Sequence, residues 1–245
     1  MFSLKREFDF TGYSFIIPSV SVGNVPQLAV DVVIETLQLE PAGQVWHPAL
    51  IPIVGPAAFE HEPSTSITTS AELYASEERK LLVLQIRAPL VGALQKQFFE
   101  LLADFVRDRK LARVFILSSS FAHEKFDIRT APFRYVANEP YNQSAEAAAR
   151  LGEGQRWIMH AGGVIHGGGY ALKLQEALTV RGVATLVFFM YVSEGDNTAE
   201  GLMLARMLHA VSGEQLLPVA ADQVDVRVPK SWKHLFGSGQ PRALY

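Results

Sequence analysis

The sequence contains no cysteine among its 245 residues. That absence excludes disulfide bonds, cysteine-ligated zinc, iron–sulfur clusters and thiol nucleophiles. Charge is scarce and nearly balanced, because 22 Lys and Arg oppose 25 Asp and Glu for a formal net charge of −3. A chain that is 49% hydrophobic and 19% charged is expected to fold. It also lacks the basic excess of a protein that coats nucleic acid.

Long apolar segments are missing as well. The first ten residues, MFSLKREFDF, carry charges where a secretory signal peptide needs an apolar stretch. The most apolar run, Val183 to Val192, has ten residues, whereas a membrane-spanning helix needs about 20. These features predict a soluble intracellular protein.

The familiar catalytic motifs are absent too. Neither the nucleophile elbow GxSxG, nor the zinc motif HExxH, nor the phosphate-binding GxxxxGK[ST] occurs. The seven histidines are scattered along the chain. Glu194 and Asp196 could form an acid pair, but helix capping and loop solubility explain both without catalysis. The sequence therefore predicts no catalytic set, no metal site and no cofactor site.

What the chain does contain is an alternation of strand and helix patterns. Apolar runs indicate strands over residues 14–20, 71–76, 80–90, 111–120 and 183–192. Helical spacing of apolar residues indicates helices over 25–37, 91–109, 143–151, 170–178 and 197–211. This β–α–β order predicts an α/β fold, a single three-layer αβα domain over residues 1–245 with a central, mostly parallel sheet.

The remaining segments predict local features. Asn24 with Gln27, and Asn197 with Glu200, have the spacing of helix capping boxes. Three prolines in residues 44–56 indicate an edge or irregular strand. Residues 60–70 and 121–142 are predicted to be mostly loop.

A glycine cluster, GGVIHGGGY at residues 162–170, is the most enzyme-like feature. Consecutive glycines before a helix can offer backbone N–H groups to a phosphate. They also allow a tight turn with close packing of strand and helix, and this structural interpretation is favoured because no basic residue follows. If Gly168 has a positive φ, its replacement by alanine should disturb folding.

Three serines, Ser118 to Ser120, end a predicted strand and precede His123. The pattern suggests a hydrolase, but serine at a strand end also forms turns and caps. The second interpretation is favoured because the nucleophile elbow is missing.

The segment at about residues 225–245 differs from the rest of the chain. Four basic side chains and one acidic side chain, Asp225, give it a net charge of +3. The rest of the chain has 18 basic and 24 acidic side chains, a net charge of −6. Trp232 and Phe236 are predicted to anchor this tail on the body, while Leu244 and Tyr245 form an apolar end.

Several strings together resemble the proteasome assembly chaperone 2 family. They are SVSVGNVPQLAVDVVIETL, LARVFILSSS, TAPFRY, HGGG before a helix, FMYVSEGDN and PKSWKHLFGSGQPRALY. Their order and spacing agree from about Ser14 to Tyr245, which is essentially the whole chain.

The resemblance implies a chaperone rather than an enzyme, with no cofactor, in cytoplasm and nucleus. Members of this family form a heterodimer with proteasome assembly chaperone 1. The pair promotes assembly of the α-ring of the 20S core particle, prevents off-pathway ring dimers, and leaves when the particle matures. The implied partners are therefore that chaperone and α subunits, with alpha type-5 and type-7 expected, and neither nucleic acid nor a membrane.

Related chaperones and activators insert a C-terminal hydrophobic–tyrosine–any residue motif into pockets between α subunits. The resemblance therefore implies α-ring binding by Arg242, Ala243, Leu244 and Tyr245. Here tyrosine is last rather than penultimate, which departs from that motif. Insertion into the ring and folding back onto the body both remain open for this tail.

Two other classes of function compete with the chaperone. The first is an α/β enzyme of nucleoside-phosphorylase-like or hydrolase type that uses the glycine-rich loop. The second is a generic scaffold, which would not bind proteasome subunits selectively.

Overall fold

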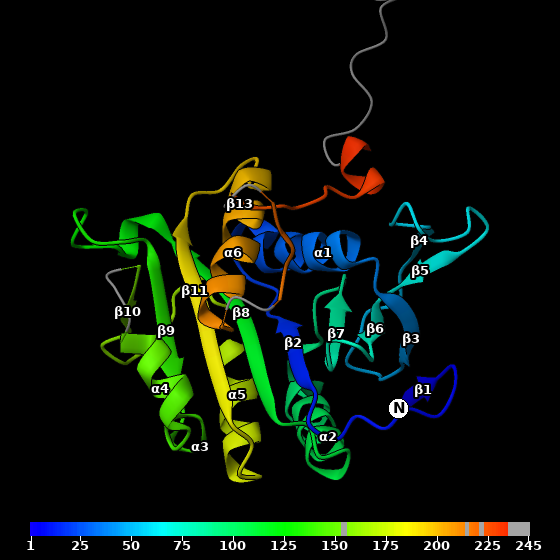
Figure 1. Cartoon of the computed structure of the whole chain (residues 1–245), viewed down its shortest axis with the longest axis horizontal. Helices are drawn as coiled ribbons and strands as arrows, with labels where there is room; N and C mark the ends of the chain where they lie inside the picture. Colours follow the sequence, from blue (N-terminus) through cyan, green and yellow to red (C-terminus); the bar gives the residue numbers. More distant parts are fainter. Residues whose placement is uncertain (153–155, 214–215, 221–222, 235–245) are drawn as a thin grey trace, which may run out of the picture.

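The computed structural model describes residues 1–152, 156–213, 216–220 and 223–234. Its centre is a nine-stranded sheet in the order β1-β3-β6-β7-β2-β8-β11-β9-β10 (Figure 1). In that order the strands are Phe2–Leu4, Glu40–Val45, Ala71–Ser76, Leu81–Ile86, Ser14–Pro18, Arg113–Phe121, Thr185–Val192, Phe133–Ala137 and Trp157–Met159.

The parallel part of the sheet is its middle. Strands β7, β2, β8 and β11 are parallel neighbours. Antiparallel pairs add β6, β3 and β1 on one side and β9 on the other, where β10 then pairs parallel to β9. The predicted α/β fold is confirmed, and the flanking antiparallel pairs make the complete sheet a mixed one.

Helices cover both faces of the sheet. α1 (Val25–Leu37) and α6 (Thr198–Val211) pack on one face, and α2 (Gln95–Asp108) and α5 (Ala171–Val180) on the other. The strands alternate accordingly: Phe15 and Ile17 of β2 face α2 and α5, whereas Ile16 faces α1. The two short helices α3 (Glu139–Asn142) and α4 (Ala145–Gly152) lie beside β9 and add Tyr141 and Leu151 to the α1 side.

Smaller elements complete the described part. Two-stranded sheets join β4 (Val54–Pro56) to β5 (Ile67–Thr69), and β12 (Val219–Ala220) to β13 (Gln223–Val224). The 3-10 turns are η1 (Val22–Asn24), η2 (Gly92–Leu94), η3 (Ala122–Glu124) and η4 (Lys230–His234). No helix in the described ranges is long and apolar enough to span a bilayer.

Two sequence predictions fail at the loops. Residues 121–142 are not mostly loop, since they contain β9 and α3, and β5 occupies the end of 60–70. The signal in β9 is weak because only Phe133 is buried and the other four residues are half-buried.

Both predicted capping boxes are wrong. The side chains of Asn24 and Asn197 make no capping hydrogen bond, and Asn24 has a left-handed backbone with φ 52°. Asp196 instead accepts from the N–H of Thr198 at 3.0 Å, which provides the cap at the start of α6.

Candidate functional site

The carboxyl ends of parallel strands are where open α/β sheets usually bind ligands. In this protein residues 165–170, which we call the glycine plug, fill that position beside β2 and β8. The Tyr170 hydroxyl donates to the Pro18 carbonyl at 2.7 Å, and the Val22 N–H donates to the Gly167 carbonyl at 2.9 Å. The plug is thus hydrogen-bonded directly to the end of β2 and to the turn that follows it.

Serine hydroxyls hold the plug in place. The Ser19 hydroxyl donates to the Gly168 carbonyl at 2.8 Å and accepts from the Tyr170 N–H at 3.0 Å. Ser118 donates to the same carbonyl at 3.0 Å, and Ser120 donates to the His166 carbonyl at 2.9 Å.

The remaining serine of the predicted triplet is also engaged. The Ser119 hydroxyl donates to the Val22 carbonyl at 2.6 Å and lies 2.7 Å from the Ser21 hydroxyl. His123 is exposed and stacks on the Phe121 ring, with 5.1 Å between ring centroids. These buried hydroxyls are therefore bonded to the backbone and to one another, as a turn requires, rather than to a histidine base.

The glycines are required by close approach. Gly167 and Gly169 have φ of 79° and 62°, and a Cβ on Gly169 would overlap the Val20 carbonyl oxygen. Gly168 does not have a positive φ, so backbone strain is the wrong reason to expect that Gly168→Ala disturbs folding. A Cβ there would instead lie 2.6 Å from Cγ2 of Ile165.

Two backbone N–H groups of the plug are already engaged within the protein. The Gly168 N–H donates to the Ile165 carbonyl at 2.9 Å, and the Tyr170 N–H is taken by Ser19. A phosphate site needs N–H groups that point at the ligand. The geometry supports the structural interpretation of this loop.

The other candidate acids do not assemble either. Asp196 accepts from the N–H and the hydroxyl of Thr198 at the start of α6, and these hydrogen bonds lower its pKa. Glu194 is exposed. Within the described residues no group of three His, Asp or Glu side chains is placed to hold a metal ion.

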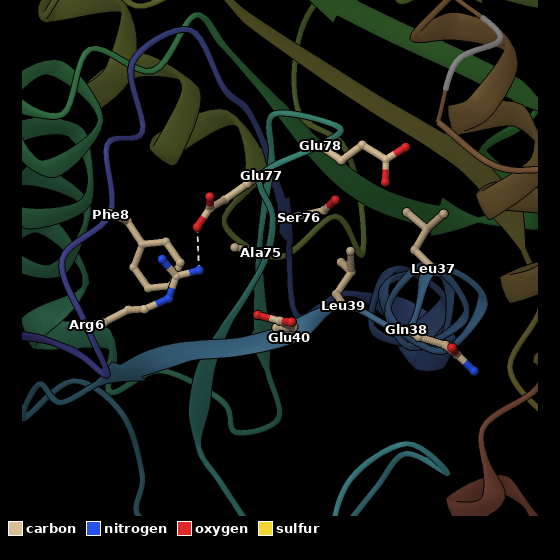
Figure 2. A pocket seen from close by; sticks show the side chains of 10 residues that line it. All are labelled: Arg6, Phe8, Leu37, Gln38, Leu39, Glu40, Ala75, Ser76, Glu77 and Glu78. Atoms are coloured by element: carbon tan, nitrogen blue, oxygen red, sulfur yellow. Dashed lines mark hydrogen bonds and ion pairs between the residues drawn. The ribbon is translucent and has the colours of Figure 1, made fainter.

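A surface pocket of about 380 Å³ lies where the N-terminal segment meets the end of α1 and the β6–β7 turn (Figure 2). The Arg6 guanidinium lies 4.0 Å from the centre of the Phe8 ring and forms an ion pair with Glu77. Glu40 and Glu78 also line the pocket. Figure 2 shows a charged surface hollow with an exposed ion pair, which is worth little in stability.

A buried ion pair ties α1 to β7. Arg87 Nη2 lies 2.8 Å from Asp31 Oδ1, and the Gln85 amide donates to the same oxygen at 2.6 Å. Nearby on β6, burial raises the pKa of Glu72. No sequence pattern predicts this cluster, and its one signal is Asp31, a charged residue in the middle of an apolar helix.

The base of the tail is docked onto the body. Trp232 in η4 is buried in the core on the α1 side. The Arg227 N–H donates to the Thr36 hydroxyl at 2.9 Å, and the Ser231 N–H donates to the Ala58 carbonyl at 3.4 Å. Phe236 and residues 242–245 lie outside the described residues.

The tail base, residues 227–234, lies beside a stretch of chain that is acidic. Residues 38–76 contain four glutamates and no lysine or arginine. Lys230 and Lys233 line a cavity of about 570 Å³ together with Glu60 of that stretch and with Arg87, which is paired with Asp31. The basic tail base thus lies over the least basic part of the chain.

Exposed apolar side chains occur at several places, Val180 and Met1 among them, and two groups of them lie at the two ends of the sheet. At the β4–β5 end, Val54 and Ile67 are 73% and 60% exposed. At the β9–β10 end, Phe126, Ile128 and Met159 are 91%, 87% and 66% exposed. Figure 1 places these ends on opposite sides of the sheet. Exposed apolar patches of this kind mark candidate protein-binding surfaces.

Comparison with known proteins gives one consistent answer. The model of the PAC2 family matches residues 15–213. Proteasome assembly chaperone 2 of Homo sapiens is 34% identical, covering 97% of this chain and 96% of the human protein. Proteasome assembly chaperone 2 of Danio rerio is also 34% identical, with 96% of both chains covered.

Solved structures share the fold at low identity. Pyrococcus furiosus PbaA, described as an archaeal homolog of proteasome-assembly chaperone, has a TM-score of 0.65 at 16% identity, with 91% of this chain and 89% of that chain covered. Pyrococcus furiosus PbaB, described as an archaeal proteasome activator, has a TM-score of 0.65 at 14% identity, with 90% of each covered.

Proposed function

This chain belongs to the PAC2 family, and we propose that it is a chaperone of proteasome assembly that works as a heterodimer with proteasome assembly chaperone 1. In this proposal the pair promotes assembly of the 20S α-ring and prevents off-pathway ring dimers. The observation that carries the proposal is similarity to proteasome assembly chaperone 2 over 97% of the chain. A shared fold alone would be weaker support, because one fold hosts many functions.

The sealed strand ends favour a non-enzymatic role. The position where an α/β enzyme would bind its ligand is occupied by the glycine plug, and the buried serines there are bonded to the backbone. The polar side chains at this crevice form hydrogen bonds that close it. Its exposed apolar side chains are on the outside, where a protein partner can cover them.

The proposed partners are the first chaperone and α subunits, with alpha type-5 and type-7 the expected contacts, in cytoplasm and nucleus. Two apolar surfaces at opposite ends support binding of more than one protein at a time. Such surfaces also lead us to expect that the chain self-associates when its partner is missing.

The tail is proposed to reach the α-ring through Arg242 to Tyr245. Its base supports this role, because buried Trp232 fixes η4 to the body while Lys233 is exposed. An apolar side chain beside a terminal carboxylate suits a pocket that contains a lysine.

Co-purification tests the proposed function. The tagged chain, co-expressed with the first chaperone and α subunits, should retain both, as identified by mass spectrometry. A chain that retains neither, and is instead stabilised against heat by nucleosides or phosphate, would be an enzyme of the competing class.

Removal of residues 243–245 tests the tail separately. Weaker α-ring capture at an unchanged melting temperature of the heterodimer supports insertion. A lower melting temperature with unchanged capture shows that the tail folds back onto the body. No change in either quantity excludes both roles.

A further inference from the structure

The loop of residues 122–131, which we call the display loop, joins β8 to β9. Its Phe126 and Ile128 are 91% and 87% exposed, more than any other large hydrophobic side chain of the described residues. Leaving two such side chains in water forgoes about 1.5–3 kcal/mol of burial for each. A partner that covers them would gain this energy.

The display loop has a defined shape despite its exposure. Asp127, between the two apolar residues, accepts from the Arg129 N–H at 3.0 Å through its carboxylate and from the Thr130 hydroxyl at 2.9 Å through its carbonyl. Arg134 of β9 then braces the loop by donating to the Thr130 hydroxyl at 3.0 Å and the Ala131 carbonyl at 2.6 Å. A loop that is already ordered loses less conformational entropy when it binds.

An unpaired strand edge lies at the same end of the molecule. β10 is the last strand in the sheet order, and within the described residues it pairs with β9 alone (Figure 1). Its Met159 is 66% exposed, whereas Trp157 is buried and donates to the Leu151 carbonyl at 3.1 Å. The strand is thus anchored on α4 while its outer edge remains available to a partner.

The charge at this end indicates the chemistry of the partner. The display loop and its surroundings carry four cations, Lys125, Arg129, Arg134 and Arg156, against three carboxylates, Glu124, Asp127 and Glu194, the last of which follows β11. Asp127 and Arg129 pair with each other, which leaves three cations against two carboxylates. A matching surface would therefore combine an apolar pocket with carboxylates at its rim.

We propose that the display loop and β10 form the surface that binds the partner chaperone, with Phe126 and Ile128 inserted into an apolar pocket rimmed by acidic side chains. This inference rests on the proposed function and adds the location of the chaperone interface. The tail base is docked at the opposite end, where Ser231 bonds to Ala58. Binding of the partner chaperone at the display loop therefore leaves the tail end exposed to the α-ring.

The test replaces both apolar side chains, with Phe126→Ser and Ile128→Ser in one chain. The matched control is Val54→Ser with Ile67→Ser, which removes two exposed apolar side chains at the other end. Binding to the purified partner chaperone is measured by titration, and the melting temperature of each variant alone verifies folding. The display-loop variant should bind at least about 30-fold more weakly, and the control should bind like the unmodified chain.

Two single variants test the mechanism. Asp127→Ala keeps Phe126 and Ile128 but removes the carboxylate that accepts from the Arg129 N–H. The bond from Thr130 to the Asp127 carbonyl remains, so binding should weaken by an intermediate factor. Lys125→Glu should weaken binding and reduce its sensitivity to salt, because an attraction to the acidic rim is lost.

The outcomes separate this inference from the proposed function. If the display-loop variant binds the partner chaperone normally, the interface lies elsewhere, and the inference fails while the function stands. Loss of α-subunit capture alone, or loss only of self-association between copies of this chain, also overturns it. If the unmodified chain binds neither the chaperone nor α subunits, the proposed function and this inference fail together.

Discussion

The glycine plug and the display loop meet at the end of β8 and use their residues in opposite ways. The plug is closed inward, with Gly167 and Gly168 bonded through their carbonyls to residues around β2 and β8. The display loop begins directly after Phe121, the last residue of β8, and leaves its apolar side chains exposed. One strand end thus separates a sealed crevice from an exposed apolar surface.

Of the substitutions considered, replacing Gly169 with alanine should reduce the stability of the chain most. The new Cβ would meet the Val20 carbonyl and force a left-handed backbone on a residue that disfavours it. We expect a loss of about 3 kcal/mol in the free energy of unfolding, measured by urea denaturation without any ligand.

Gly182→Ala is the matched control for this effect. Gly182 has a similar φ of 70° with nothing within 4 Å of the added Cβ, so only the backbone penalty of about 1 kcal/mol applies. Equal losses in the two variants would show that the plug is not tightly packed.

Removing the hydroxyl of Ser19 should cause the next largest loss of stability. Ser19→Ala leaves the Tyr170 N–H without its acceptor and should cost about 1–3 kcal/mol. Ser118→Ala should cost less, because the Gly168 carbonyl still accepts from Ser19. Thermal melts of both variants give the order, and a larger effect at Ser118 would contradict this account of the plug.

The display loop should respond very differently in the isolated chain. Phe126→Ser and Ile128→Ser remove no buried contact, so each should change the free energy of unfolding by less than about 0.5 kcal/mol. A large loss by chemical denaturation would mean that these side chains stabilise the fold rather than serve a partner.

The smallest expected effect is a dependence of stability on pH at His160, the residue after β10. Burial lowers the pKa of His160 below its ordinary value of 6.5 in the folded chain. As the pH falls, His160 therefore takes up its proton in the unfolded chain first. The contribution of neutral His160 to the stability of the fold is complete above pH 6.5 and is lost as the pH falls through the pKa of the folded chain. His160→Gln should reduce the drop in urea midpoint between about pH 7.5 and 5.5, and an unchanged drop would assign it to other groups.

The sequence predicted the middle of the molecule better than its edges. Strands β8 and β11 are continuous apolar runs because helices cover both of their faces. β10 has three residues and an exposed face, so no periodicity could reveal it. The capping boxes failed because Asn24 has a left-handed backbone, which its neighbours in the fold impose and its sequence spacing does not show.

The candidate surfaces were harder still to predict. The aromatic residues of the tail predict Trp232 as an anchor, and Trp232 is buried in the structure. The strings that carry the family resemblance include TAPFRY but not Phe126 or Ile128. Their only sequence signal is an apolar residue on each side of Asp127 in a polar segment, and exposure becomes visible only when the loop is folded.

The span of chain that closes the plug also sets an order on folding during synthesis. Ser19 and Tyr170, which bond across the plug, are 151 residues apart, whereas the partners of β2 in the sheet are complete by Phe121. At roughly 5–20 residues per second, the ribosome delivers Tyr170 roughly 8–30 s after Ser19. Until then Ser19 lacks the partner that it has in the folded chain, so the plug closes only after the middle of the sheet has been synthesised.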